Sequence, residues 1–421
     1  MLDLRAIRAE PEGVRAALAR RGADGALDEL IALDERARAL RVAVEEERAR
    51  RGRLSKEIGA AKRAGAAAPE LEDEARRLGE ALAADEAELR EVEGRRDEVL
   101  IALPNLPEAD APDGGEDDAV ELRRVGDPPA FDFEPRDHLD LGTAAGALDL
   151  ERAARTSGAR FAYLLGPLVR LQLALVAYAV DLLEGEGFTP VVPPVLVREE
   201  AMYGTGFFPT DRASIYSTAD DDLYLVGTSE VPLAAMRMDE ILDAGELPLR
   251  YAGISTCFRR EAGAAGRDTR GIFRVHQFDK VEMFSFTTPD ASRDEHRLLV
   301  SLQERILQSL DIPYRVVDIA VGDLGASAAR KLDCEAWMPG QGRYREVTSC
   351  SNCTDYQARR LGVRTRGERG NEPVHTLNGT AVAVGRTIVA ILENHQRADA
   401  SVAVPAVLHP FGAPSEITPS P

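Results

Sequence analysis

The chain has 421 residues, 44% of them hydrophobic, which is enough for two or three domains with a substantial buried core. Its formal net charge of −20 argues, over the whole chain, against a nucleic-acid partner, because phosphate binding depends on clustered lysines and arginines. Four cysteines are too few for a disulfide framework, which suits a reducing cytoplasm, and no apolar run reaches the roughly 20 residues that cross a membrane.

Two apolar repeats with heptad spacing stand in the N-terminal part of the chain. The first covers residues 33–61 and the second 71–103, with a break that contains Pro69. This pattern predicts two helices that fold back on each other as an antiparallel coiled coil. We therefore expect an N-terminal helical domain over residues 1–103, with the coiled-coil arm at about 30–103.

The first helix of this arm is basic toward its tip. Residues 48–63 contain a single acid, Glu57, and seven basic residues: Arg48, Arg50, Arg51, Arg53, Lys56, Lys62 and Arg63. A solvated coiled coil whose opposite charges pair across the hairpin accounts for this pattern, because the returning helix is mainly acidic. The alternative is a surface that binds a polyanion.

The stretch after the arm changes in composition. Residues 104–135 are rich in proline, glycine and aspartate, which predicts a linker with one short strand. Residues 136–421 alternate between helical and strand patterns, which predicts an α+β domain. We expect its last stretch, 412–421, to fray.

The segment YLVGTSEVPLAAM places Thr228 and Glu230 two residues apart. On an extended segment they would form a small polar pair suited to an α-amino group. The alternative is a helix that begins here with Thr228 or Ser229 as its N-cap.

The stretch CFRREAGAAGRDTRGIFRVHQFDKVEMFSF, residues 257–286, alternates like a β-hairpin. Side chains of a strand alternate between its two faces, so we expect Arg259 and Glu261 to share one face. Arg274, Phe278 and Glu282 would share one face of the second strand, and Lys280 would lie on the same side. Such a face is too charged for a core. It predicts the floor of a site for a ligand that is anionic, planar and amine-bearing in different parts; the alternative is an exposed, salt-bridged ribbon.

The segment TLNGTAVAVGRTIVAILENHQ predicts a turn at Asn378-Gly379, a strand over 380–384 and then a helix. Arg386 would lie in the first turn of that helix. The free N–H groups and the macrodipole of a helix N-terminus favour an anion, so the arginine and the helix end could act on one phosphate.

Together these segments resemble the class II aminoacyl-tRNA synthetases. GFTPVVPPVLV, with Pro194, is similar to their motif 1, the hairpin to motif 2, and NGTAVAVGRTIVAILEN to motif 3. VGTSE, FRREAG, GRDTRG, HQFDKVE and SCSNCTDYQARR resemble the bacterial seryl-tRNA synthetases, and the resemblance spans essentially the whole chain in the expected order. It implies an antiparallel sheet flanked by helices, a homodimer formed through motif 1, and an arm that holds tRNA.

The resemblance also implies the reaction. The enzyme would be an ATP-dependent, AMP-forming ligase that converts serine and ATP into seryl-adenylate and then charges tRNA-Ser, and also tRNA-Sec. ATP would be a substrate, Mg²⁺ the cofactor, and the basic residues of the arm tip would contact the tRNA.

By the same resemblance, individual residues take separate roles. Arg259, Arg274 and Arg386 would be the catalytic cations around the triphosphate, Phe278 would stack under the adenine, and Glu261 would lie near its amino group. Glu346 and Ser349 would bind Mg²⁺. Serine would contact Thr228, Glu230, Arg259, Glu282, Asn378 and Thr380. No acid-base residue is implied, because adenylation needs fixed cations more than a general base.

Two other interpretations compete with this one. A paralogue with the same fold could charge a carrier protein or serve as an antibiotic-resistance copy, although the known carrier-protein relatives lack a long arm. A coiled-coil scaffold with an inactive body would have no need to retain Arg259, Glu282, Glu346 and Arg386 together.

Overall fold

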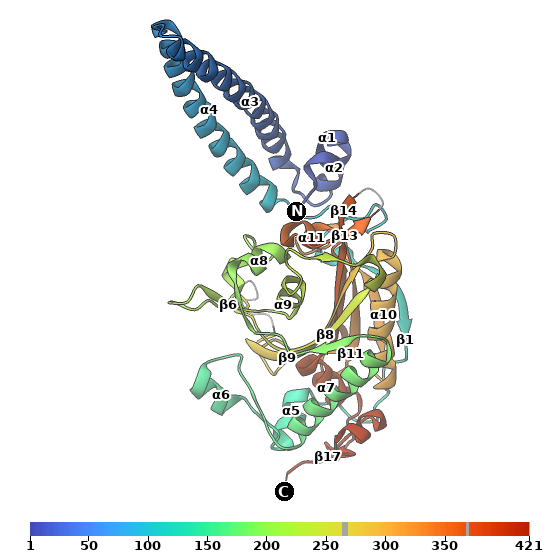
Figure 1. The fold of residues 1–421 in the computed structure, drawn as a ribbon. Coiled ribbons are helices and arrows are strands. Elements are labelled where there is room, and N and C mark those ends of the chain that lie inside the picture. The colour runs from blue at the N-terminus through green and yellow to red at the C-terminus, as the bar shows by residue number, and fades with distance from the viewer. Residues whose placement is uncertain (263–267, 368–369, 421) are drawn as a thin grey trace. The chain divides into compact units, whose positions relative to one another are not determined.

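The computed structural model describes residues 1–262, 268–367 and 370–420 (Figure 1). The chain divides into two compact units. One is Leu2–Pro104, and the other is Asn105–Pro421 together with Met1.

The first unit is helical. Helices α1 (Leu4–Ala9) and α2 (Pro11–Ala19) and a short 3₁₀ turn (Asp24–Ala26) precede two long helices, α3 (Leu27–Arg63) and α4 (Pro69–Ala102). The long helices pack against each other along the arm and are joined by a short connection (Figure 1). The predicted helical hairpin, with its restart at Pro69, is confirmed.

The heptad spacing explains how the two long helices pack against each other. Small and branched apolar side chains of both helices are buried between them: Ala37, Leu40, Val44 and Leu54 on α3, and Leu78, Leu82 and Val99 on α4. Near the base, Asp34 on α3 is buried and accepts hydrogen bonds from Arg8 at 2.7 Å and from Arg38 at 3.1 Å. This ion pair fastens α1 to the start of the arm.

The second unit is built on an eight-stranded sheet in the order β1-β10-β11-β12-β15-β9-β8-β4. The neighbouring strands are antiparallel except for the parallel pair of β4 and β8. The strands are β1 (Val120–Val125), β10 (Tyr314–Asp318), β11 (Arg330–Met338), β12 (Arg343–Asn352), β15 (His375–Ala383), β9 (Gln277–Thr287), β8 (Leu249–Phe258) and β4 (Thr189–Val191). The expected antiparallel sheet with flanking helices is confirmed.

Helices cover both faces of the sheet. The helices of this unit are α5 (His138–Ala144), α6 (Leu150–Ser157), α7 (Pro167–Gly185), α8 (Glu199–Thr205), α9 (Glu230–Ala235), α10 (Ser292–Ser309), α11 (Tyr356–Leu361) and α12 (Val384–Asn394). Apolar residues of α7, α10 and α12 share one core with Val281 and Met283 of β9. Residues of α9 and α11 pack with Phe284 and Phe286 from the opposite face of β9.

Short elements complete the unit. Two-stranded sheets pair β2 (Leu148–Asp149) with β3 (Tyr163–Leu164), β5 (Leu196–Arg198) with β6 (Leu223–Leu225), and β16 (Val402–Ala403) with β17 (Glu416–Ile417). In a three-stranded sheet, β13 (Arg364–Gly367) lies between β7 (Ile241–Leu242) and β14 (Gly370–Pro373). Short 3₁₀ helices cover Glu116–Asp118, Arg212–Ser214, Ala244–Glu246, Val321–Asp323, Pro339–Gln341 and Ala406–Phe411. Of the helices in the described part of the chain, none combines the length and the apolar character that a membrane span requires.

The segment 104–135 contains one short strand, as expected, and this strand, β1, pairs with β10 at the edge of the main sheet. Two local expectations differ from the structure. The C-terminal stretch does not fray through residue 420, because Ile417 is buried and Ser420 Oγ donates to Ala145 O at 2.8 Å. The predicted turn at Asn378-Gly379 is wrong, since both residues lie inside β15. Gly379 instead permits close packing: a Cβ there would lie 3.1 Å from Cys350 Sγ.

Candidate functional site

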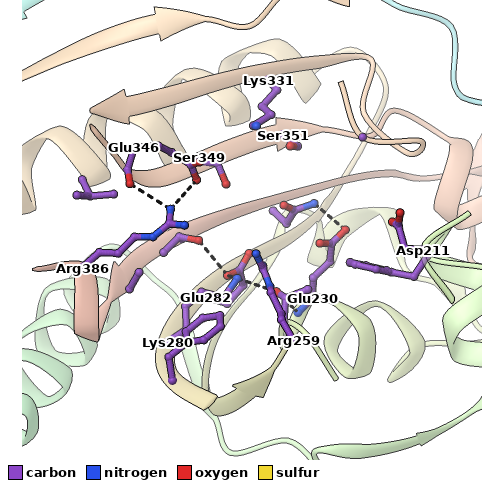
Figure 2. A pocket seen from close by; sticks show the side chains of 18 of the residues that line it. Asp211, Glu230, Arg259, Lys280, Glu282, Lys331, Glu346, Ser349, Ser351 and Arg386 are labelled. Atoms are coloured by element: carbon purple, nitrogen blue, oxygen red, sulfur yellow. Dashed lines mark hydrogen bonds and ion pairs between the residues drawn. The ribbon is translucent and has the colours of Figure 1, made fainter. Parts of the chain in front are cut away.

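A cavity of about 320 Å³ lies on the sheet face beside α9 and extends to the start of α12 (Figure 2). Its wall contains every residue predicted for the nucleotide, the amino acid and the metal: Thr228, Glu230, Arg259, Glu261, Arg274, Phe278, Glu282, Glu346, Ser349, Asn378, Thr380 and Arg386. Segments far apart in the sequence therefore meet in one place.

Strand β9 supplies the floor of this cavity. Phe278, Lys280 and Glu282 alternate along β9 and all line the cavity, whereas Val281 between them belongs to the core behind the sheet. The alternation inferred from sequence holds for this strand. The alternation also predicted that Lys280 lies on this face, and the structure confirms it, although the sequence assigned Lys280 no role.

A bulge in β12 brings Glu346 and Ser349 to the same face. Residues three apart on a regular strand point to opposite sides. Glu346 pairs with Glu335 and Thr348 pairs with Cys334, so Val347 is an extra residue opposite the partner strand. Such a bulge shifts the alternation by one. Both oxygen-bearing side chains consequently line the cavity.

The two ends of the motif 2 hairpin differ from the prediction. Strand β8 ends at Phe258 and β9 begins at Gln277, so the expectation that Arg259, Glu261 and Arg274 lie on the strands is wrong. The backbone leaves the ladder at this point, and Glu261 has a left-handed φ of 52°. The cavity nevertheless contains all three side chains.

The side chains beyond the strands are held by hydrogen bonds. Arg274 Nη1 donates to Glu261 Oε2 at 2.6 Å, and Arg259 Nε donates to Gly227 O at 3.1 Å. The Arg259 guanidinium carbon lies 5.4 Å from the centre of the Phe278 ring. Figure 2 shows Arg259 close to the carboxylates of Glu230 and Glu282.

Glu230 is the first residue of α9, which begins with Ser229 as its N-cap. The predicted extended segment is therefore wrong at Glu230, and the alternative of a helix start applies. Glu230 Oε1 accepts hydrogen bonds from Gln357 Nε2 at 2.7 Å and from Asn378 Nδ2 at 2.9 Å. Burial and the nearby Glu282 carboxylate raise the pKa of Glu230 to about 7.

Thr228 and Lys280 connect the two carboxylates of this end of the cavity. Lys280 Nζ forms an ion pair with Glu282 and donates to Thr228 Oγ1 at 2.7 Å, and Glu230 N donates to the same hydroxyl oxygen at 3.2 Å. Thr380 Oγ1 donates to Glu282 Oε2 at 3.4 Å. A hydroxyl oxygen has two acceptor positions. Thr228 can therefore accept a ligand ammonium only if one of these two donors releases it.

The opposite end of the cavity is formed by α12 and β12. Arg386 lies in the first turn of α12, as predicted, and Arg386 Nη1 is 3.1 Å from both the carboxylate and the carbonyl oxygen of Glu346 (Figure 2). Burial alone would raise the pKa of Glu346, but the cations Arg386, Lys331 and Arg259 outweigh burial and lower this pKa to about 2.

Lys331 is a cation of the cavity wall that the sequence did not reveal. It lines the cavity from β11, and Lys331 Nζ lies 3.2 Å from Asp333 Oδ2. Burial raises the pKa of Asp333 to about 7 against the opposing effect of Lys331. The alternation of β11 indicates that Lys331 and Asp333 share a face. The sequence does not show how β11 pairs with its neighbours, so it does not show which face of the strand meets the cavity.

The predicted basic residues at the arm tip fall into two groups, and all are exposed. Arg48 pairs with Glu86 at 2.9 Å, Lys62 with Glu72 at 2.8 Å, and Arg50 with Glu74, so these three bridge the helices of the hairpin. Within the described part of the chain, the remaining four form no ion pair: Arg51, Arg53, Lys56 and Arg63. The charge pairing expected from sequence and a set of unpaired cations thus coexist on the arm.

Comparison with known proteins agrees with this architecture. Residues 1–107 match the seryl-tRNA synthetase N-terminal domain, and residues 214–395 match the tRNA synthetase class II core domain (G, H, P, S and T). The serine–tRNA ligase of Acidothermus cellulolyticus is 54% identical over 412 residues, with 98% of each chain covered. That of Streptomyces coelicolor is 53% identical, covering 98% of this chain and 97% of the relative.

Solved structures show the same relationship. The seryl-tRNA synthetase of Pyrococcus horikoshii, complexed with ATP, is 43% identical with a TM-score of 0.95 and 100% of both chains covered. The Giardia lamblia prolyl-tRNA synthetase is 14% identical with a TM-score of 0.57, covers 64% of this chain and 54% of its own, and shares the fold alone. With half of its residues identical over nearly its whole length, the chain belongs to the seryl-tRNA synthetase family of the class II aminoacyl-tRNA synthetases.

Proposed function

We propose that this protein activates serine with ATP to give seryl-adenylate and pyrophosphate, and then transfers serine to the 3′ end of tRNA-Ser. The observation that carries the proposal is the placement of Glu230, Arg259 and Glu282 at one end of the cavity. These three side chains match the ammonium, carboxylate and hydroxyl groups of serine. The names of the relatives and the ATP complex of the Pyrococcus structure support the same substrates.

Serine recognition follows from the hydrogen-bond inventory. The recorded donors to Glu230 contact Oε1, so Oε2 can take the α-ammonium. Lys280 and Thr380 both contact Glu282 Oε2, so Oε1 can accept the serine hydroxyl. Arg259 would hold the carboxylate. Thr228 stays a predicted ammonium contact that requires Lys280 or the Glu230 amide to move.

ATP would occupy the other end. Phe278 offers a face for adenine, with Glu261 near its amino group, and Arg274 and Arg386 would bind the phosphates. A serine carboxylate oxygen attacks the α-phosphorus, a new O–P bond forms, and the bond to pyrophosphate breaks. The fixed arginines stabilise the charge that develops, and no proton transfer is needed.

The residues at the bulge of β12 fit Mg²⁺. Glu346 is an ionised carboxylate and Ser349 a hydroxyl, both half-buried on the cavity wall, and hard oxygen donors are what this ion prefers. Bound there, Mg²⁺ would neutralise phosphate charge. Arg386, which now contacts Glu346, would turn its guanidinium toward the γ-phosphate.

The arm would hold the tRNA through its unpaired cations. Arg51, Arg53, Lys56 and Arg63 can meet phosphates without breaking an ion pair recorded in the structure, whereas Arg48, Arg50 and Lys62 would first have to leave Glu86, Glu74 and Glu72. Charging of tRNA-Sec remains a prediction from family resemblance.

The protein would act as a homodimer in the cytoplasm. Large apolar side chains are exposed on motif 1, at Val192 (81% exposed) and Leu196, and on the preceding segment of β3 and α7, of which α7 contacts β4: Tyr163, Leu165, Val169 and Leu173. Such a set is typical of an interface. Sedimentation velocity should show a dimer, and Leu173→Glu should shift it toward monomer; a monomeric parent protein would refute this assignment.

Two assays test the main proposal. Purified protein should catalyse serine-dependent exchange of pyrophosphate into ATP and should charge tRNA-Ser transcripts with serine. Exchange without charging would favour the carrier-protein paralogue, because the first half-reaction alone would remain. Absence of exchange would refute the proposal.

A further inference from the structure

We propose that His138, together with Glu393, is a positioning element that fixes three ATP-binding segments to one another. His138 is the first residue of α5 and is 4% exposed, and Glu393 of α12 is 0% exposed. The inference rests on the proposed ATP site. His138 does not line the cavity, so it would act on ATP only through other residues.

The hydrogen bonds of this pair define the tautomer of the ring. Ile272 N donates to His138 Nε2 at 3.1 Å, so Nε2 is an acceptor. The ring hydrogen is then on Nδ1, which donates to Glu393 Oε1 at 2.8 Å. The same carboxylate oxygen also accepts from His138 N at 3.1 Å.

The backbone of the motif 2 segment lies directly against this ring. Gly271 has φ +77°, and a Cβ at this position would lie 2.0 Å from His138 Nε2. The glycine therefore permits both the backbone conformation and the approach that places Ile272 N on the ring. Two independent features of the chain thus specify the same contact.

Three elements of the ATP site converge on the pair. Glu393 lies seven residues, or about two helical turns, after Arg386 on α12. Its other oxygen, Oε2, accepts from Gly340 N at 2.9 Å, and Gly340 lies in the connection between β11 and β12, shortly before Glu346. The third element is the segment from Ile272 to Arg274.

A displacement of Ile272 would also move the two residues that follow it, and both lie close to the proposed phosphate site. Phe273 follows Ile272, and the guanidinium carbon of Arg386 lies 4.9 Å from the centre of the Phe273 ring. Arg274 is the next residue and lines the cavity. The residues proposed for serine lie on β9, on β15, around the start of α9 and, for Arg259, just after the end of β8. Their recorded hydrogen bonds do not involve His138 or Glu393, and Arg259 donates to Gly227 O. The pair should therefore affect ATP and not serine.

Two substitutions of His138 test the roles of the two ring nitrogens separately. An asparagine amide can replace the Nδ1 donor but does not reach the position of Nε2, whereas a glutamine carbonyl reaches that position as an acceptor. His138→Asn should keep the bond to Glu393 and lose the bond to Ile272. His138→Gln should keep an acceptor for Ile272 N, while Glu393 retains its bonds to the backbone of residues 138 and 340.

The test is pyrophosphate exchange with separate titration of ATP and serine. His138→Asn should raise KM for ATP about tenfold, the effect of one lost buried hydrogen bond, and change KM for serine less than about twofold. His138→Gln should keep KM for ATP within about threefold of the parent. His409→Asn, which changes a histidine that contacts Val404 O in the C-terminal part, is the control and should match the parent.

Hydrogen exchange of the Ile272 amide gives a readout that does not depend on activity. The amide should exchange faster in His138→Asn than in the parent or in His138→Gln. The inference would be overturned if the two substitutions had equal effects on KM for ATP and on hydrogen exchange of the Ile272 amide. It would also be overturned if His138→Asn raised KM for serine as much as KM for ATP. Parent protein without serine-dependent activity would instead refute the proposed function, while the hydrogen-exchange comparison would still judge the role of His138.

Discussion

Arg386 Nη1 contacts Glu346 twice, at 3.1 Å through the carboxylate and at 3.1 Å through the carbonyl oxygen. A cation at a helix N-terminus opposes the macrodipole unless an anion is close. Glu346 supplies that anion in the free protein, and ATP would supply it in the complex. The two residues join α12 to β12 across the end of the cavity that we propose for the phosphates.

Removal of this cation should abolish activation. Arg386→Ala is expected to lower the rate of pyrophosphate exchange by about 10²-fold or more, because a fixed charge on the leaving phosphates is lost. Arg397→Ala, which removes the ion pair with Glu416 near the C-terminus, serves as the control. Unchanged exchange in Arg386→Ala, with the fold verified by its melting curve, would remove the motif 3 assignment.

Glu282 should decide selectivity for the hydroxyl group. Glu282→Gln is expected to lower kcat/KM for serine by about 10²-fold, since a charged acceptor worth a few kcal/mol becomes a neutral amide, and to change KM for ATP little. The ratio of serine to alanine exchange should fall with it. A preserved ratio would show that another residue senses the hydroxyl.

The activity should depend on the ionisation of Glu230. The pKa of Glu230 is raised to about 7, and only the ionised carboxylate attracts the α-ammonium of serine. Binding of serine should therefore strengthen as the pH rises through 7. We expect kcat/KM for serine to increase about tenfold between pH 6 and pH 8. Glu230→Gln should be poorly active and should lose this rise. A rise that persists in Glu230→Gln would assign the titration to another group, such as Asp333.

The unpaired cations of the arm should contribute more to tRNA binding than the paired ones. Replacing Arg51, Arg53 and Lys56 by alanine should leave exchange unchanged, raise KM for tRNA, and lower the slope of log affinity against log salt by about 0.7 to 0.9 for each lost phosphate contact. The matched control replaces Arg36 and Arg41, which pair with Glu88 and Glu93 nearer the base. Equal effects of the two sets would show that the distribution of charge on the arm is unrelated to tRNA.

The sequence predicted the elements whose pattern is local. The heptads gave the arm and its restart at Pro69, and strand alternation gave the shared face of Phe278 and Glu282. It failed where tertiary packing decides the conformation. Gly379 was predicted to lie in a turn, but its missing side chain instead allows close packing against Cys350. Arg259 and Arg274 were predicted to lie on strands, but they lie beyond the ends of β8 and β9.

Two members of the site were missed for one reason. Lys331 lines the cavity and pairs with Asp333 on the same face of β11, and which face of β11 meets the cavity depends on strand pairing between residues far apart in the chain. The bulge at Val347 likewise depends on the partner strand β11. Family resemblance named Glu346 and Ser349 but could not explain how residues three apart share a face.

The central claim is that one cavity recognises serine by its hydroxyl while it binds ATP. The most direct measurement is pyrophosphate exchange with each of the twenty amino acids in turn. The account predicts strong exchange with serine and at least about 10²-fold less with alanine, glycine and threonine. Comparable exchange with alanine, or greater exchange with any other amino acid, would contradict it.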